Sequence, residues 1–356
     1  MRLVDLRSSA PAPSLQVTVQ ASAAAELLRL IGVLCSEEPK EFDVGQERLE
    51  RIRASLSEEL TAEIGELRAT EDGKDFLILS LLAAELPEPS GVQELVDTLR
   101  EDPALSWRVL VSYLSNKLDP APELTGQVQA GDEAALQRLR ELVEEAGGEP
   151  ELTALLESDP ADHGKRLASI VERFEEEAWR DVEDEAMGPI RRDVAHRQDR
   201  LASGVDPMAV IVEATNGYEP PDDAGLRRVV LLPSYWMRPW LVLGQSLNTE
   251  VISTVVADEF LILPSEAPPP ALLKLAKALS DERRLRLLRR MASGPVSLSE
   301  ATDALDVTKA TAHHHLSILR QAGLVSMRGT GRATRYALRS DPADAARDAL
   351  SAYCCR

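Results

Sequence analysis

The sequence lacks most of the features that mark secreted and membrane proteins. Its 356 residues include three cysteines, too few for a disulfide framework, so we expect a reducing, cytoplasmic location. No apolar run reaches the roughly 18 residues of a membrane span, and the N-terminus has no continuous apolar core like that of a signal peptide. Because 44% of the residues are apolar, packed cores can form. We therefore expect a soluble protein of more than one domain, with no membrane partner.

Signs of catalysis are equally scarce. Only His163 and His196 precede the histidine cluster at 313–315. The sequence has no Gly-rich phosphate loop, no H-E-x-x-H motif and no G-x-S-x-G motif. We expect no enzyme, with no catalytic residues and no cofactor.

Charge is divided unevenly along the chain. Residues 268–340 hold 13 Lys and Arg against 5 Asp and Glu, a net charge of +8, and residues 341–356 hold 2 against 3, a net charge of −1. The total of −20 therefore leaves −27 for residues 1–267. Because salt screens charges over a Debye length of about 8 Å, the basic segment can attract phosphates locally. The acidic part should repel nucleic acid and so restrain nonspecific binding.

The basic segment begins with the pattern of two helices. Residues 281–291 place three apolar side chains at helical spacing among five arginines, which predicts an amphipathic helix with a basic outer face. Its expected inward residues are Leu285, Leu288 and Met291. Ser297 stands three residues before Glu300, the capping-box spacing of a helix start. A second helix should therefore begin near Leu298.

A third helix and a hairpin should follow. Thr308 can cap a helix over 308–322, and Gly323 can end it. Its inward side chains should be Ala312, Leu316 and Leu319, and its outward ones Lys309, Ala310, Thr311, His313, His314 and Ser317. Strands at 324–327 and 334–338 then flank a tip whose two glycines suit a turn. The order of elements predicts a helix-turn-helix followed by a basic β-hairpin wing.

These motifs together resemble the ArsR-type winged helix of bacterial regulators. The resemblance rests on D-E-R-R-L-R-L-L-R-R-M, T-K-A-T-A-H-H-H-L-S-I-L-R-Q-A-G-L-V and the G-T-G-R wing, and it covers roughly residues 268–340. It implies that the third helix enters the major groove of an operator in double-stranded DNA, and that the wing touches the backbone or minor groove. The DNA-binding residues that it implies are Lys309, Thr311, His313, His314 and Ser317 on the helix, with Arg328, Arg332 and Arg335 on the wing.

Metal sensing, a known role of that family, is not expected. The helix that would carry a thiolate site reads L-S-E-A-T-D-A-L, and the final helix offers Asp341, Asp344 and Asp348 without histidine. Consecutive histidines on a helix diverge by about 100° each and cannot share one ion. We expect His315 to pack inward, and the role of Cys354 and Cys355 stays open.

One recognition helix reads only a few base pairs, so we expect a homodimer on two half-sites. The expected interface helix spans 271–279, with the last helix joining it. The interface residues would be Leu272, Leu275, Ala276 and Leu279 on the first helix, with Ala345, Ala346, Ala349 and Tyr353 on the last. The alternative is that both helices merely pack on their own winged helix.

The N-terminal part is expected to be α+β and mostly helical up to about residue 203. We predict helices at 21–34, 46–57, 75–86, 91–101, 104–117, 131–146 and 149–158, with a long one between 164 and 202 whose Trp179 and Val182 face inward. Four short apolar runs between 226 and 263 predict a small antiparallel sheet, which a strand at 15–19 would join. The predicted division is an acidic regulatory or dimerisation domain at 1–264, a Pro-rich linker at 265–270 and the winged helix at 271–356.

Aromatic residues make up only 4% of the chain, and their densest cluster lies at 235–240. Tyr235, Trp236 and Trp240, with Arg238 among them, are candidates for a small-molecule effector pocket, or else ordinary core of the sheet. The favoured function is a homodimeric repressor that binds operator DNA. Two alternatives stay open: an enzyme with an attached DNA-binding unit, and a protein-interaction module whose acidic domain holds a partner.

Overall fold

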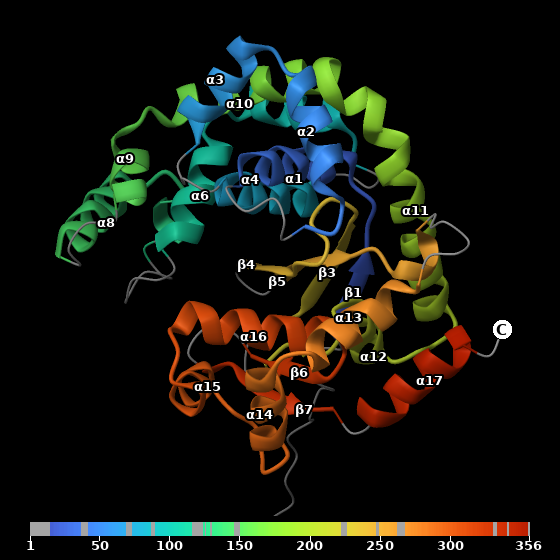
Figure 1. The fold of residues 1–356 in the computed structure, drawn as a ribbon. Coiled ribbons are helices and arrows are strands. Elements are labelled where there is room, and N and C mark those ends of the chain that lie inside the picture. The colour runs from blue at the N-terminus through green and yellow to red at the C-terminus, as the bar shows by residue number, and fades with distance from the viewer. Residues whose placement is uncertain are drawn as a thin grey trace, which may run out of the picture.

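The protein forms two main hydrophobic cores, one from its N-terminal part and one from its C-terminal part. The computed structural model describes residues 15–36, 42–68, 73–86, 90–115, 124, 126–128, 130–145, 150–221, 226–246, 249–261, 268–329, 333–339 and 342–354. In Figure 1 the first core lies in the upper, blue-to-yellow part and the second in the lower, orange-to-red part. Within the described ranges no helix is both long and apolar enough to cross a membrane.

The N-terminal part is built around the buried helix α1 (Ala23–Cys35). The helices predicted for this part are confirmed. Ser22 caps α1 by accepting a hydrogen bond from the amide of Ala25 at 2.9 Å. A helix that is apolar on almost every side belongs inside a core. The helices are α1 (Ala23–Cys35), α2 (Gln46–Ser55), α3 (Glu58–Leu67), α4 (Lys74–Leu79) with a 3-10 turn (Ser80–Glu85), α5 (Val92–Glu101), α6 (Leu105–Ser115), α8 (Glu133–Glu145), α9 (Pro150–Glu157), α10 (Pro160–Phe174), α11 (Arg180–Ala202) and α12 (Pro207–Ala214). Helices α3 and α12 were not predicted.

The predicted long helix is a continuous run of α10, a π-helical turn (Glu175–Trp179) and α11. Asp159 accepts hydrogen bonds from the amides of Ala161 and Asp162, and Pro160 occupies the first turn, where its missing N–H costs nothing. Trp179 is fully buried and Val182 is 4% exposed, so the predicted inward side is confirmed. The second half of this long helix, α11, packs against the sheet of the N-terminal part.

The four-stranded sheet is mixed, and the prediction of an antiparallel sheet was wrong for most of it. Its strands are β1 (Gln16–Val19), β3 (Arg228–Ser234), β4 (Val242–Ser246) and β5 (Thr249–Val255), in the order β1-β3-β5-β4. β1 and β5 both run parallel to β3, and only β4 and β5 are antiparallel. The predicted participation of residues 15–19 is confirmed.

Burial on both faces explains this arrangement. On one face Val230 and Leu232 pack against Ala84 of the 3-10 turn, and on the other Val229 and Leu231 join the main core. Strands covered on both faces read as continuous apolar runs and are typical of parallel pairing. The run predicted as a strand at 260–263 instead begins in a 3-10 turn (Asp258–Phe260), and residues 262 and 263 lie outside the described ranges.

The C-terminal part has the predicted winged-helix order. Its elements are α13 (Pro270–Leu279), α14 (Glu282–Met291), α15 (Leu298–Leu305), α16 (Lys309–Gln321), β6 (Val325–Arg328), β7 (Arg335–Leu338) and α17 (Pro342–Cys354). The capping box of Ser297 and Glu300 is present, and Thr308 caps α16 through the amide of Thr311. Gly323, at a φ of +71°, follows the end of α16 as predicted. Of the predicted linker, residues 265–267 lie outside the described ranges and Pro270 already belongs to α13.

Of the residues predicted to face inward on α14, Met291 is buried and Leu288 packs partly buried against the core, but Leu285 was predicted wrongly. Leu285 is 46% exposed, whereas Leu287 and Arg284 are buried. The Arg284 guanidinium donates to the carbonyl oxygens of Ala278 at 2.9 Å and Lys277 at 2.5 Å. These hydrogen bonds satisfy carbonyls at the end of α13, so a charged side chain occupies an inward position that hydropathy alone would not assign to it.

Candidate nucleic-acid interface

Helix α16 presents the predicted reading residues on its outward side. Ala312, Leu316 and Leu319 are fully buried, which confirms the inward face. Of the residues predicted to contact DNA, Lys309, His313 and His314 are exposed, and Thr311 and Ser317 are half-buried. The Thr311 hydroxyl lies 2.9 Å from that of Thr308, so it takes part in the helix cap. Since α16 (Lys309–Gln321) contains no acidic residue, its outer surface is neutral to basic.

The three consecutive histidines have different environments. His315 is 6% exposed and packs inward as predicted. Desolvation and the Arg320 guanidinium lower the pKa of His313. A neutral imidazole offers one donor and one acceptor at the groove-facing surface. Among the described residues no group of histidine, cysteine and acidic side chains could hold a metal ion.

The wing is a hairpin with paired arginines at its outer end. Arg328 on β6 and Arg335 on β7 are cross-strand partners, and both are exposed. Val296 forms a bridge with Tyr336 that ties the hairpin to the start of α15. Arg332, the third predicted wing residue, lies outside the described residues. The two arginines place positive charge at the end of the hairpin next to its tip.

The predicted dimer helices leave apolar side chains exposed. Helix α13 contacts both α14 and α17 (Figure 1). The exposed large apolar residues are Leu273 (53%), Leu279 (38%), Leu285 (46%), Leu350 (50%) and Tyr353 (42%). Of the predicted stripe, Leu275 is buried in its own domain and Leu272 is half-buried, while Ala276 and Leu279 are exposed. The side chains of Ala345, Ala346 and Ala349 lie outside the described set.

The aromatic segment at 235–240 is a buried turn. Glu26 accepts hydrogen bonds through one carboxylate oxygen from the amides of Tyr235 at 2.6 Å and Trp236 at 2.8 Å. Trp236 is fully buried, and Arg238, also buried, pairs with Asp258 at 3.1 Å. Trp240 packs half-buried against the main core. This environment fits the alternative of ordinary core, and an effector role for these residues stays a prediction.

An unpredicted junction joins the N-terminal part to the reading helix. The segment 215–219, which we call the junction segment, follows α12 and contains β2 (Tyr218–Glu219). β2 pairs in parallel with β6 and makes the wing a three-stranded sheet, β2-β6-β7. The amide of Met327 donates to Gly217 at 2.8 Å and that of Gly329 to Glu219 at 3.1 Å. The outer edge of the wing is therefore covered by the chain's own N-terminal part.

Side chains at the junction bind the last turn of α16. The Asn216 amide donates to the carbonyl oxygens of Arg320 at 2.9 Å and Gln321 at 2.8 Å. Arg320, which is 7% exposed, donates to the carbonyl of Thr215 at 2.7 Å, and burial lowers its pKa to about 10. Asn216 has a φ of +54° and Gly217 a φ of +101°, and a Cβ on Gly217 would lie 3.3 Å from the Cα of Ser326. The Asn-Gly pair was the one sequence signal for this turn.

A buried polar pair connects the junction to the N-terminal sheet. Tyr218 donates its hydroxyl to Glu250 of β5 at 2.5 Å, and both residues are buried. Burial raises the pKa of Glu250, and the hydrogen bond from Tyr218 offsets part of that rise. β2 is thus bonded to the wing through its backbone and to the sheet through its side chain. Hydrogen bonds and strand pairing therefore join α16 and the wing to the N-terminal part.

Comparison with known proteins identifies the C-terminal part. The family model described as "Helix-turn-helix domain" matches residues 279–328. The HTH-type transcriptional regulator CmtR of Mycobacterium bovis is 36% identical over 77 residues, which cover 22% of this chain and 65% of that protein. The biofilm growth-associated repressor of Agrobacterium fabrum is 34% identical over 97 residues, 25% of this chain and 83% of that protein.

A third relative is the transcriptional activator HlyU of Vibrio cholerae, 30% identical over 82 residues, 23% of this chain and 76% of that protein. A solved structure of reduced HlyU is 27% identical, covers 24% of this chain and 90% of that chain, and has a TM-score of 0.19. The chain thus spans about 65% of the length of the mycobacterial relative and more of the other two. Through its C-terminal helix-turn-helix domain, the chain belongs to the ArsR family of DNA-binding transcriptional regulators.

Proposed function

We propose that the protein is a homodimeric, sequence-specific repressor that reads operator DNA with α16 and contacts the DNA backbone with its wing. One observation carries the proposal: the outward side of α16, in a winged helix of the ArsR family, presents Lys309, His313 and His314 and no acidic residue. The first turns of such a helix are the part that meets base edges in the major groove.

The side chains of α16 and those of the wing serve different contacts with DNA. Lys309 can donate to the O6 and N7 acceptors of guanine, and a neutral His313 can donate to or accept from a base edge. Arg328 and Arg335 on the wing neutralise phosphates, which sets affinity and its salt dependence but not sequence preference. Specificity should therefore reside in α16 and salt sensitivity in the wing.

The exposed apolar residues on α13, α14 and α17 support the homodimer. Leu273 and Leu350, each about half exposed on helices that contact one another, would be covered by the same surface of a second copy. Two copies would present two reading helices to half-sites about one helical turn apart. A dimer bound to a promoter in this way would block transcription without a further partner.

The junction supports a regulatory role for the N-terminal part. Asn216 and Arg320 tie that part to the last turn of α16, so any change in the placement of the junction segment moves the reading helix. The N-terminal part also carries a net charge of −27, which opposes binding to DNA. We propose that it adjusts operator affinity and that the small molecule or partner that controls it acts through this junction.

The test begins with selection of bound genomic fragments by the full-length protein. The selected operator and a scrambled duplex are then compared by fluorescence anisotropy for the native protein and a variant with Lys309→Ala and His313→Ala. We expect discrimination between the duplexes to fall by roughly 1 to 3 kcal/mol per lost base contact. Lys165→Ala, an exposed change of equal charge outside the winged helix, is the control. Unchanged discrimination in the double variant would remove both residues from the reading face.

A further inference from the structure

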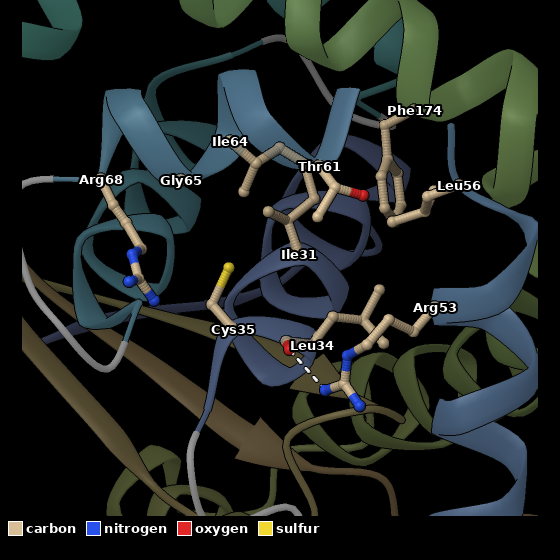
Figure 2. A pocket seen from close by; sticks show the side chains of 10 residues that line it. All are labelled: Ile31, Leu34, Cys35, Arg53, Leu56, Thr61, Ile64, Gly65, Arg68 and Phe174. Atoms are coloured by element: carbon tan, nitrogen blue, oxygen red, sulfur yellow. Dashed lines mark hydrogen bonds between the residues drawn. The ribbon is translucent and has the colours of Figure 1, made fainter. Parts of the chain in front are cut away.

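A cavity lies in the N-terminal part, away from the reading helix. It is formed where α1, α2, α3 and the end of α10 meet, and its volume is about 260 Å³ (Figure 2). Its lining residues are Ile31, Leu34, Cys35, Arg53, Leu56, Thr61, Ile64, Gly65, Arg68 and Phe174. None of these residues takes part in the contacts described above for the winged helix, the junction or the exposed apolar residues of α13 and α17.

The lining is divided into an apolar side and a charged side. Figure 2 shows Ile31, Ile64 and Phe174 on one side, and the guanidinium groups of Arg53 and Arg68 flanking Cys35 on the other. An apolar wall with a few converging polar groups is typical of a small-molecule site. The arrangement calls for a ligand with an apolar body and a negative head.

The electrostatics of the charged side support this. Burial and, to a smaller extent, the nearby Asp75 raise the pKa of the Cys35 thiol, the positive charges of Arg68 and Arg53 lower it, and the net result is a pKa of about 11. Cys35 is therefore a neutral thiol at physiological pH, and the charged groups around it are the guanidiniums of Arg53 and Arg68 and the buried carboxylate of Asp75, so positive charge predominates there. A planar carboxylate matches the fork of a guanidinium, which can hold it with two parallel hydrogen bonds.

The size of the cavity limits the ligand. An engineered cavity of about 150 Å³ holds benzene, a six-atom ring. A cavity of about 260 Å³ therefore has room for about ten non-hydrogen atoms. That corresponds to a ring or branched chain carrying one carboxyl group.

Helix capping is a simpler explanation for an arginine at this position, and the test must distinguish it from ligand binding. Arg53 donates to the carbonyl of Leu34 at 2.5 Å and so binds the C-terminal end of α1. A guanidinium has five donors, and this bond uses one. Helix capping thus accounts for one hydrogen bond of Arg53 but not for a cavity beside it.

We propose that this cavity binds a small monocarboxylic acid of about ten non-hydrogen atoms in all, with the carboxylate on Arg53 and Arg68 and the apolar body against Ile31, Ile64 and Phe174. That such an acid regulates operator binding rests on the proposed function. The binding itself does not, because it is measured without DNA.

The probe is phenylacetate, titrated into the full-length protein by isothermal calorimetry, with phenylacetamide as its neutral counterpart. For about ten ligand atoms we expect a dissociation constant between about 0.1 and 1 mM for phenylacetate and at least tenfold weaker binding of the amide. Arg53→Met and Arg68→Met should each weaken phenylacetate about tenfold or more. Arg51→Met, an exposed arginine on the same helix as Arg53 and outside the cavity lining, should leave binding unchanged.

A variant at Gly65 tests the site by adding a side chain, with little risk of unfolding the protein. A Cβ added at Gly65 meets no atom within 4 Å, and Gly65 lies inside α3, where a leucine favours the helix. Gly65→Leu should keep the native circular dichroism and melting temperature and weaken phenylacetate binding. Equal binding of acid and amide would overturn the assignment of the carboxylate to the arginines. No saturable binding at about 10 mM, or unaltered binding to both Arg53→Met and Arg68→Met, would overturn the site.

If binding is found but phenylacetate leaves operator affinity unchanged, the ligand site stands and its link to regulation fails. If the protein binds no operator at all, the calorimetry still decides the ligand site. The two proposals therefore fail in separate experiments.

Discussion

Replacing Asn216 tests whether the junction holds the reading helix. Its side chain makes two hydrogen bonds to the last carbonyls of α16 and accepts a third from Arg339 at 3.2 Å. At about 0.5 to 1.5 kcal/mol net for each of the three hydrogen bonds, their loss should lower the free energy of unfolding by about 1.5 to 4.5 kcal/mol. Asn216→Gly removes these bonds and keeps the positive φ available.

Asn216→Ala adds a second effect that can be separated from the first. Alanine at a φ of +54° is strained, so this variant should lose about 1 kcal/mol more than Asn216→Gly. The positive-φ residue Asp306 is the control, because it is exposed and lies at the end of α15, away from the junction. Its glycine and alanine variants should differ by the same strain without the hydrogen-bond loss.

Urea denaturation gives the free energies of unfolding, and amide hydrogen exchange locates the effect. The amides of Met327 and Gly329 donate to the junction segment, so both should exchange faster in Asn216→Gly. If Asn216→Gly stays within about 0.5 kcal/mol of the native protein and these two amides keep their protection, the side chain does not hold α16. The mechanical coupling that we infer would then be refuted.

Three further predictions concern the dimer, the wing and acid stability. Leu273→Glu combined with Leu350→Glu should shift the protein from dimer to monomer in analytical ultracentrifugation with an unchanged circular dichroism spectrum, because both side chains are exposed in the single chain; a dimer that persists would move the interface elsewhere. Arg335→Ala should weaken operator and scrambled DNA alike and reduce the salt slope by up to about one per protomer, whereas a loss confined to the operator would contradict a backbone contact. Burial lowers the pKa of His163 to about 4 from its ordinary 6.5. The unfolded chain therefore binds the proton more readily between these values, and stability should fall by up to about 3 kcal/mol as pH drops from about 7 to 4. His163→Gln should lose that part of the slope in urea titrations, and an unchanged slope would show that His163 does not titrate as a buried neutral group.

Local signals in the sequence determined the elements of the winged helix. Ser297 with Glu300 and Thr308 mark helix starts because side-chain oxygens satisfy backbone amides within three residues. The spacing of Ala312, Leu316 and Leu319 assigned the inward face of α16 because helical periodicity is a property of the chain itself. Each of these predictions depended on partners within about two helical turns.

The predictions that failed depended on contacts between separate helices and strands. Leu285 was taken as inward, but Arg284 turns inward because it reaches carbonyls at the end of the preceding helix. Strand direction was misjudged because β5 inserts between β3 and β4, a choice made by burial on both faces of the sheet. Neither partner is visible in the local pattern.

The candidate site divides in the same way. The sequence by itself determined which residues α16 and the wing present, since they follow from periodicity, caps and the resemblance to a known family. Only the tertiary structure decided that Asn216 and β2 bind the reading domain across about one hundred residues, and that α1, α2 and α3 enclose a cavity between two arginines. Hydrogen bonds and cavities of this kind are set by how separate elements pack, and that packing depends on the whole chain at once.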